Sequence, residues 1–244
     1  MTENSFESEA NQKRISIITG HFGSGKTEFA INYALKSKES DQYEQVSLID
    51  LDIANPYFRS REKQSLLNSK GIAIISNTFG YDINLDLPAI SAAINGPIQN
   101  KSCRVIIDAG GNDSGARVLT QFKNQLLDQR FELLCVINAN RYETGSLADA
   151  SHHISAIEDE LGLKITGLVN NTHMLTETTF ADLIKGMYLC RDLSFRYAIP
   201  IKYHCCAEKF EGELRSYINQ HDDPSFSGTV FPMTIYMRSS WLDR

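Results

Sequence analysis

Residues 20–27 read Gly-His-Phe-Gly-Ser-Gly-Lys-Thr and fit the pattern G-x-x-x-x-G-K-[ST] at every position. The preceding segment, Arg14–Thr19, is rich in isoleucine and is typical of a buried strand, and the following stretch, Thr27–Lys38, is typical of a helix. A strand that turns through glycines into a helix directs main-chain N–H groups and the positive end of the helix dipole at one point. The motif therefore predicts an α/β fold with a polyphosphate site at this turn.

Short apolar segments alternate with helical stretches along the rest of the chain. The predicted strands are Arg14–Thr19, Val46–Leu51, Ile72–Ser76, Arg104–Asp108, Glu132–Asn138, Ile165–Asn170 and Ile199–His204. The predicted helices are Thr27–Lys38, Glu62–Ser69, Gly115–Asp128, Gly145–Leu161 and Thr178–Phe195. Several strands are nearly continuous in Ile, Val and Leu, as expected of strands buried on both faces. This alternation predicts a doubly wound three-layer α/β sandwich with a mostly parallel sheet and ligands at the carboxyl ends of its strands.

The chain has 244 residues, 42% of them hydrophobic, which is enough for one large core. We expect a flexible leader at 1–13 and a single nucleotide-binding domain at 14–244, whose apolar end, Phe231–Arg244, packs on the domain as a strap. The N-terminus matches neither a signal peptide nor a transit peptide, and no apolar run approaches the roughly 20 residues that span a bilayer. Five cysteines, an odd number, favour a reducing compartment over a disulfide framework. A cytoplasmic protein without membrane contact is expected.

The charged residues are spread along the whole length, with 24 basic against 30 acidic side chains and a net charge of -6. A nucleic-acid-binding surface usually shows a block or stripe of Lys and Arg, and this chain has none. We therefore expect no nucleic-acid partner. An anionic ligand must be captured by local geometry rather than by the overall field of the protein.

The glycine motif predicts binding of a nucleoside triphosphate together with Mg²⁺. Lys26 is expected to reach the β- and γ-phosphates, and the hydroxyl of Thr27 is expected to bind the metal. The loop backbone supplies further N–H donors around the phosphates. The full predicted nucleotide-binding set in this part of the chain is Gly20, His21, Phe22, Gly23, Ser24, Gly25, Lys26, Thr27 and Glu28.

Carboxylates that neutralise the phosphates with magnesium are expected at the ends of neighbouring strands. Asp108 ends an apolar strand and is followed by glycines, as in a Walker B motif. Asp50 and Asp52 are two residues apart near the end of another strand, so their side chains share one face. One of this pair can hold a magnesium-bound water while the other orients or deprotonates the attacking water.

The order of these features, Gly20–Thr27, then Asp50-Leu-Asp52, then Asp108-Ala-Gly-Gly111, resembles the MinD/ParA/CobQ-like branch of P-loop proteins. That branch includes the nitrogenase iron protein and the nickel-metallochaperone GTPases, and the resemblance covers the element order of residues 14–210. It implies a homodimeric ATPase in which Lys26 and Asp52 are catalytic, Asp52 lying near the attacking water. It also implies that Asp108 and Asp50 help Thr27 to hold magnesium.

His21 departs from the MinD/ParA pattern, because that group places a lysine there which reaches across a nucleotide-sandwich dimer. An imidazole stabilises phosphate charge less well than an ammonium group. In this respect the loop is closer to the metallochaperone GTPases.

The predicted base contact follows the strand that ends near Val169. The GTPases of this branch usually carry Asn-Lys-x-Asp here, and the Asp reads guanine; this chain reads Asn170-Asn171-Thr172-His173, without an acid. An asparagine amide both donates and accepts, which suits adenine. ATP is therefore expected, with Asn170 or Asn171 as the base contact.

The main hypothesis is a Mg·ATP-dependent ATPase that acts as a switch on an unidentified partner. One alternative is a small-molecule ligase or kinase of CobQ/dethiobiotin-synthetase type, with an acceptor pocket between the Asp52 loop and Tyr81–Pro88. A second is a GTP-driven metallochaperone that binds metal at Cys205 and Cys206, two residues that otherwise serve as soft side chains lining the base pocket. A third is a module that binds nucleotide without hydrolysing it.

Overall fold

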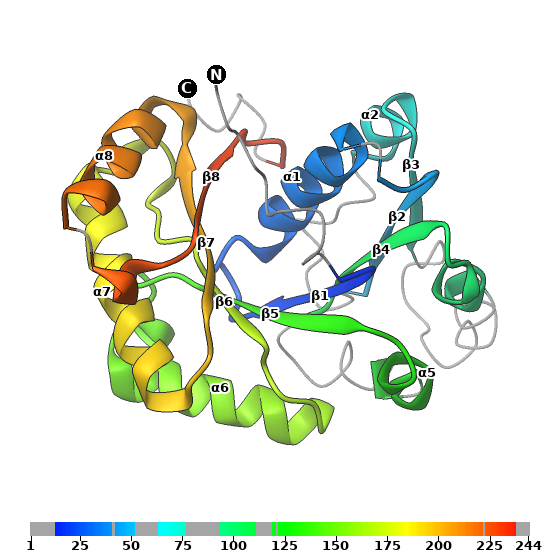
Figure 1. Ribbon diagram of the computed structural model, residues 1–244, viewed down its shortest axis with the longest axis horizontal. Coiled ribbons are helices and arrows are strands. Elements are labelled where there is room, and N and C mark those ends of the chain that lie inside the picture. The colour runs from blue at the N-terminus through cyan, green and yellow to red at the C-terminus, as the bar shows by residue number, and fades with distance from the viewer. Residues whose placement is uncertain are drawn as a thin grey trace.

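The computed structural model describes residues 13–40, 42–51, 63–76, 93–110, 119–120, 122–221 and 223–237. In this part of the chain the strands form one eight-stranded sheet in the order β3-β2-β4-β1-β5-β6-β7-β8 (Figure 1). The strands are β1 (Ile15–Gly20), β2 (Gln45–Asp50), β3 (Ile72–Ser76), β4 (Cys103–Asp108), β5 (Phe131–Ile137), β6 (Gly167–Asn170), β7 (Ile201–Ala207) and β8 (Thr229–Met233). Every pair of neighbouring strands is parallel. The predicted doubly wound α/β fold is confirmed.

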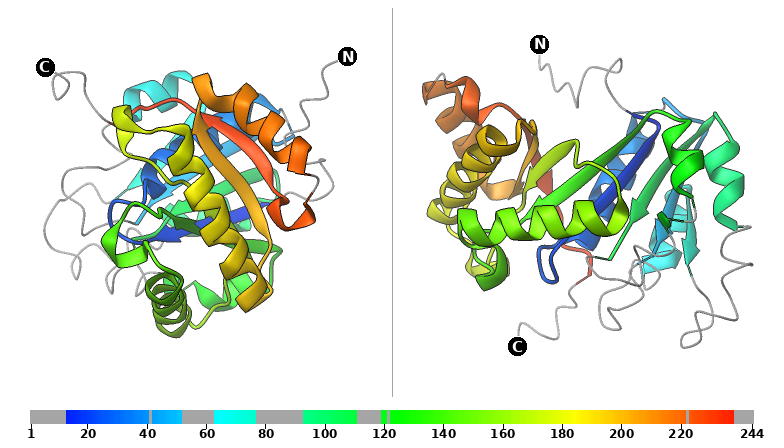
Figure 2. Two further views of the ribbon diagram at one scale, coloured as in Figure 1. Left: turned by 90° about the vertical axis from the view of Figure 1, so that its left-hand side faces the viewer. Right: turned by 90° about the horizontal axis from the view of Figure 1, so that it is seen from below.

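Helices cover both faces of the sheet, as Figures 1 and 2 show. The α-helices are α1 (Lys26–Glu39), α2 (Gln64–Ser69), α5 (Lys123–Leu127), α6 (Leu147–Leu161), α7 (Phe180–Tyr197) and α8 (Glu211–His221), and residues 93–99 are also helical. Short 3₁₀ turns lie at η3 (Tyr142–Thr144), η4 (Leu175–Glu177), η5 (Glu208–Phe210) and η6 (Pro224–Phe226). None of the helices in the described ranges has both the length and the apolar character needed to cross a bilayer.

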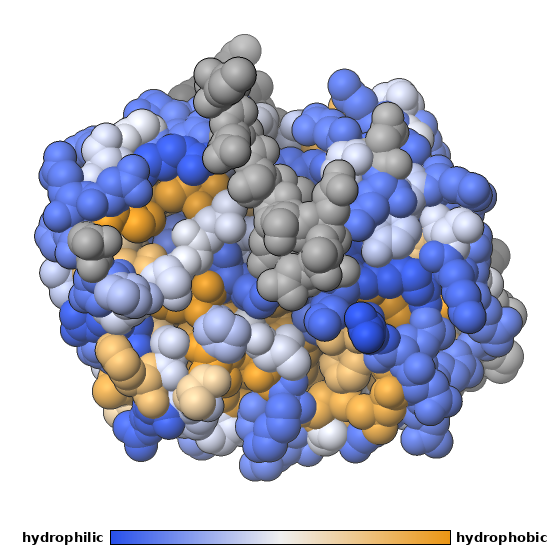
Figure 3. Space-filling model, in the orientation of Figure 1, coloured by the Kyte–Doolittle hydropathy of each residue, from blue (hydrophilic) through white to orange (hydrophobic). Residues whose placement is uncertain are grey.

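The core is divided by the sheet into two layers because side chains alternate along each strand. On one face, Phe29 and Tyr33 of α1 and Leu67 of α2 pack against the strands. On the other face lie the helical residues 93–99 with α5, α6 and the second half of α7. A smaller cluster joins α7 to α8 beside β7 and β8, where Figure 2 shows these two helices next to each other. Figure 3 shows one face of the molecule, on which hydrophilic residues are the most frequent and hydrophobic residues are visible between them.

A buried polar network fixes α1 against the centre of the sheet. Arg104 of β4 is fully buried and donates hydrogen bonds to Ser16 of β1 (2.8 Å) and to the hydroxyl of Tyr33 in α1 (2.9 Å). The same guanidinium lies 3.6 Å from the carboxylate of Glu132 in β5, which accepts hydrogen bonds from Ser16 and Tyr33. A buried charge is tolerated only when it is paired and hydrogen-bonded, so this network ties the glycine-loop helix to three adjacent strands.

Two elements near the C-terminus differ from the sequence prediction. Phe231–Met233, predicted as the start of a terminal strap, belong to strand β8, and helix α8 was not predicted at all. Strand β8 has few local signals because it is short and contains Pro232, which an edge strand tolerates. Gly212 in the first turn of α8 weakens the helical pattern. Of the predicted helix Gly115–Asp128, the structure describes α5 and residues 119–120.

Candidate nucleotide-binding site

The glycine loop connects β1, a central strand, to α1. Its Gly23 and Gly25 have φ angles of +75° and +82°, in the left-handed region that side chains disfavour, and Gly25 is the N-cap residue of α1. A Cβ atom on Gly23 would lie 2.9 Å from the guanidinium carbon of Arg141, and one on Gly25 would overlap the Asn171 amide. The two positions therefore require glycine for both backbone and steric reasons.

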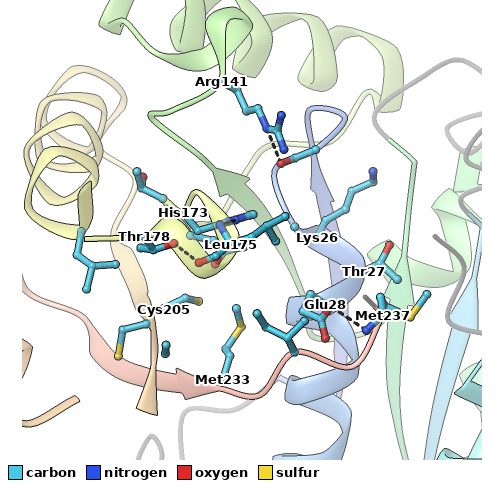
Figure 4. Close-up of a pocket in the computed structure, with 18 of the residues that line it drawn as sticks. Lys26, Thr27, Glu28, Arg141, His173, Leu175, Thr178, Cys205, Met233 and Met237 are labelled. Carbon is cyan, nitrogen blue, oxygen red and sulfur yellow. Dashed lines mark hydrogen bonds between the residues drawn. The ribbon is translucent and has the colours of Figure 1, made fainter. Parts of the chain in front are cut away.

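Two side chains that follow strands β5 and β6 hold the loop in place. Arg141, between β5 and η3, donates from Nε to the carbonyl oxygen of Gly23 (2.9 Å), a contact that Figure 4 shows. Asn171, directly after β6, donates from Nδ2 to the carbonyl oxygen of Ser24 (2.8 Å). The loop is thus braced at two successive carbonyl groups. Arg141 is not among the residues predicted from the sequence, although its place just beyond the carboxyl end of an apolar strand is a usable signal.

A cavity of about 330 Å³ opens beside the loop. On one side, the lining consists of the loop and mostly polar neighbours: Phe22, Gly23, Gly25, Lys26, Thr27, Glu28, Arg141, Asn171, Thr172, His173 and Thr178. On the other side, the lining is apolar: Leu175, Leu183, Cys205, Cys206, Ala207, Met233, Ile235 and Met237. Figure 4 shows Lys26 and Thr27 at one side of this space and Cys205 and Met233 at another. Ligand sites of this size are typically apolar with a few convergent polar groups, and this division suits a phosphorylated ligand with an apolar ring.

His21 turns away from this arrangement and does not line the cavity. Its ring contacts the ring of His153 in α6 edge-on, with 5.3 Å between the centroids, and its Nδ1 lies 2.9 Å from the carbonyl oxygen of Phe22. Burial, and after it the proximity of His21 and Lys26, lowers the pKa of His153 to about 4. Since His153 is then neutral near pH 7, it adds no positive charge to the loop.

Asp50 and Asp108 end adjacent strands and are both buried. They are direct partners in the register between β2 and β4, and Asp108 is also the partner of Ile18 in β1, two residues before Gly20. The carbonyl oxygen of Asp108 accepts a hydrogen bond from the backbone N–H of Leu51 (2.8 Å), which keeps the two strand ends together. Asp108 therefore ends the strand next to β1, which leads into the glycine loop, and Asp50 ends the strand beyond it. The predicted catalytic residue Asp52 lies outside the described residues, as do Tyr81–Pro88.

The two asparagines predicted to contact the base are separated by the structure. Asn170 is buried inside the protein: its Nδ2 donates to the carbonyl oxygen of Leu183 (3.3 Å), and its Oδ1 accepts from the hydroxyl of Thr172 (2.9 Å). It does not line the cavity, whereas Asn171 does. Adjacent residues at a strand end point to opposite sides, which explains why only one of the pair reaches the site.

His173 carries a defined tautomer beside the loop. Its Nδ1 accepts a hydrogen bond from the backbone N–H of Leu175 (3.3 Å), so the proton is on Nε2. Burial, and after it the positive charge of Arg141, lowers the pKa of His173 to about 4. The ring therefore presents a neutral N–H donor to the cavity near pH 7.

Glu28, a predicted nucleotide-binding residue, lines the cavity but uses both carboxylate oxygens within the protein. These oxygens accept hydrogen bonds from the backbone N–H groups of Tyr236 and Met237, the latter at 3.1 Å. One helical turn further along α1, Asn32 exchanges two 2.9 Å hydrogen bonds with the backbone of Thr234. We call residues 234–237 the C-terminal strap. Glu28 and Asn32 thus hold a wall of the cavity against the glycine-loop helix.

Cys205 and Cys206 lie on opposite faces of β7 and pack in different core clusters. Burial raises the pKa of the Cys206 thiol to about 11 and holds that of Cys205 well above its ordinary value. Within the described ranges, no three His, Cys, Asp or Glu side chains are grouped closely enough to hold a metal ion. Both side chains therefore contribute to the cavity as neutral thiols.

No protein-family model matches this chain, and no curated protein matches it by sequence. Solved structures match it by fold. The cell division protein ftsY from Thermotoga maritima is 22% identical, with a TM-score of 0.50, over 77% of this chain and 60% of its own. FtsY from Mycoplasma mycoides is 18% identical, with a TM-score of 0.50, over 79% of this chain and 59% of its own. The chloroplast FtsY from Physcomitrella patens is 15% identical, with a TM-score of 0.51, over 78% of this chain and 58% of its own.

This chain thus spans about 60% of the length of the first of these structures. At these identities the likeness concerns the fold, and it agrees with the parallel sheet and with a glycine loop that joins a central strand to a helix. The protein has the fold of the P-loop NTPases.

Proposed function

We propose that this protein is a Mg·ATP-binding P-loop ATPase that acts as a nucleotide-dependent switch on a partner protein. The observation that carries the proposal is a glycine loop, braced by Arg141 and Asn171, beside a cavity with Lys26 and Thr27 at its polar side. Lys26 binds the β- and γ-phosphates in this proposal, and the loop N–H groups and the α1 dipole add to the attraction.

The residues beside the loop fit magnesium by the chemistry of their donor atoms. Thr27 offers a hydroxyl, and Asp50 and Asp108 offer carboxylates at paired positions of β2 and β4. Magnesium prefers oxygen ligands and is typically held by one or two carboxylates together with phosphates. When bound, the ion would neutralise charge on the phosphates. In the proposed reaction, Asp52 positions the attacking water.

The apolar side of the cavity supports adenine as the base. It is formed largely by aliphatic and sulfur-containing side chains, among them Leu175, Cys205 and Met233. Glu28 is the one carboxylate among the described lining residues, and both of its oxygens accept hydrogen bonds from the strap. Guanine is usually read by a carboxylate that accepts from its ring and amino N–H groups, so this wall favours ATP over GTP.

The order of the motifs supports a finer assignment, which is also part of the proposal. Within the P-loop NTPases we place the chain in the MinD/ParA/CobQ-like branch, and we propose a homodimer as the functional form. Asp108 ends the strand next to the loop strand β1, and Asp50 ends the strand beyond it. This arrangement agrees with the motif order of that branch.

The proposal is tested by isothermal titration calorimetry with ATP and GTP in the presence and absence of Mg²⁺, together with phosphate release. We expect Mg²⁺-dependent ATP binding that is at least tenfold tighter than GTP binding, and loss of that binding in Lys26→Ala. Lys164→Ala is the matched control. Lys164 is an exposed lysine that precedes β6, and it lies at the amino-terminal end of this strand, away from the glycine loop.

Each part of the proposal has its own contrary result. Absence of binding by either nucleotide, or equal binding by Lys26→Ala, contradicts the nucleotide site. Tighter binding of GTP contradicts the base assignment, and tight binding without any phosphate release contradicts the ATPase.

A further inference from the structure

Arg141 lies directly over the glycine loop although it is 118 residues away from it in sequence. Its Nε donates to the Gly23 carbonyl oxygen at 2.9 Å, and its terminal Nη2 lies 3.0 Å from the point where a Gly23 Cβ would be. The side chain also lines the cavity, and Figure 4 shows it above the same loop that carries Lys26. The Arg141 guanidinium therefore lies beside the glycine loop and at the cavity that this loop borders.

Within the described ranges, the positive charge of Arg141 is not paired with a carboxylate. The hydrogen bond to Gly23 occupies only one of its five N–H donors. Its positive charge contributes, after burial, to the lowered pKa of His173, which also lines the cavity. An arginine with unused donors beside an anion-binding loop is suited to bind a further anionic oxygen.

The backbone around Arg141 is fixed by buried groups. Its own N–H donates to the carbonyl oxygen of Asn138 (3.1 Å), and that oxygen also accepts from the hydroxyl of Thr144 (2.8 Å). The N–H of Thr144 in turn donates to the carbonyl oxygen of Arg141 (3.2 Å), and both Asn138 and Thr144 are fully buried. The exposed Arg141 side chain thus starts from a fixed backbone, which lowers the reorganisation needed to place its guanidinium on a ligand.

His21 and Arg141 both lie at the glycine loop but differ in their position relative to the cavity. His21 follows the first glycine of the loop but packs on His153 instead of lining the cavity. Of the described residues that line the cavity, Lys26 and Arg141 are the ones with a permanent positive charge. Arg141 can therefore supply, from within the same chain, a second permanent positive charge at the cavity beside that of Lys26.

We propose, on the basis of the ATPase function proposed above, that Arg141 is a further catalytic residue that binds the terminal phosphate of ATP. In the reaction, the water oxygen forms a bond to the γ-phosphorus, and the bond from the γ-phosphorus to the bridging oxygen breaks. The electron pair of that bond goes to ADP, and the water proton leaves to phosphate or solvent. Arg141 keeps its own protons throughout and stabilises the charge that spreads over the γ-phosphoryl oxygens.

The test compares Arg141→Gln with Arg141→Lys in the full chain. Glutamine keeps a donor for the Gly23 carbonyl oxygen but loses the charge, whereas lysine keeps the charge. Arginines of this kind contribute about 10³–10⁵ to kcat in P-loop enzymes, so we expect Arg141→Gln to lower kcat at least a hundredfold and Arg141→Lys to restore part of that loss. Arg130→Ala is the matched control, because Arg130 is an exposed arginine immediately before β5, at the other end of the strand.

Affinity for nucleotide analogues gives a readout that a purely structural role would not change. The affinities for ADP and for ADP plus aluminium fluoride, which mimics the transferring phosphoryl group, are measured by calorimetry. We expect Arg141→Gln to weaken the affinity for the fluoride complex at least tenfold more than the affinity for ADP alone. If both affinities fall equally, or if Arg141→Gln keeps wild-type turnover and fluoride affinity, the proposal is wrong. Nucleotide binding that depends on Lys26, together with phosphate release, would still support the ATPase proposal in that case.

Discussion

The connection between Glu28 and the C-terminal strap leads to a prediction about the base side of the cavity. Glu28→Ala removes two hydrogen bonds that a partly buried carboxylate accepts from the backbone N–H groups of Tyr236 and Met237. Hydrogen bonds to charged groups are worth about 1.5–3 kcal/mol each, but the strap is partly exposed and its N–H groups can turn to water. Burial also raises the pKa of Glu28, so its charged form already bears a desolvation cost.

We therefore expect Glu28→Ala to weaken the attachment of the strap to α1 by about 2 kcal/mol. Because 1.4 kcal/mol corresponds to a tenfold change in an equilibrium constant, ATP affinity is expected to fall up to about 30-fold. Inorganic tripolyphosphate lacks a base, so its affinity is expected to stay within about threefold of the wild-type value if only this wall is affected. Titration calorimetry with both ligands measures the difference, and urea unfolding gives the change in stability.

Asn32→Ala is the decisive companion variant. Asn32 does not line the cavity, but it holds the strap through two 2.9 Å hydrogen bonds to Thr234. If Glu28 acts through the strap, the Asn32 variant should also weaken ATP and spare tripolyphosphate. A loss in Glu28→Ala with no loss in Asn32→Ala would refute this reasoning and show that Glu28 contacts the nucleotide directly. Unchanged ATP affinity in both variants would show that the strap does not form the base wall.

Two further predictions concern the loop and the core. Gly25→Ala places a methyl group against Asn171 at a φ of +82°, and the left-handed conformation alone costs about 1–2 kcal/mol. We expect calorimetry to show that ATP binding is lost and circular dichroism to show that the fold is retained. Wild-type affinity for ATP would contradict the geometry of the loop. Burial lowers the pKa of His204 to about 4, so His204 stays neutral in the folded state while the unfolded chain takes up a proton below about pH 6.5. Stability should therefore fall by about 1.4 kcal/mol per pH unit between pH 6.5 and 4 on account of this residue, and His204→Gln should show a shallower slope in urea unfolding, whereas parallel slopes would contradict the assignment.

The sequence by itself determined the fold class and the location of the glycine loop. The segment around Ile72–Ser76 matches β3 residue for residue, and the other six predicted strands overlap the observed ones. Such segments are recognised from neighbours in sequence, because runs of Ile, Val and Leu and the turn chemistry of glycine are local properties. That Asp50 and Asp108 lie at the same end of the sheet as the loop also follows from the sequence, because parallel strands end on one side; their direct pairing depends on the strand order.

Tertiary structure alone decided which distant residues complete the site. Arg141, Asn171 and Tyr236 are 118, 147 and 208 residues away from their partners Gly23, Ser24 and Glu28. Their positions depend on the order of strands in the sheet, and local patterns leave many orders open. Likewise, the sequence could not choose between Asn170 and Asn171, because that choice depends on which side of the β6 end faces the cavity. The edge strand β8 and the strap after it became recognisable only through their contacts with β7 and α1.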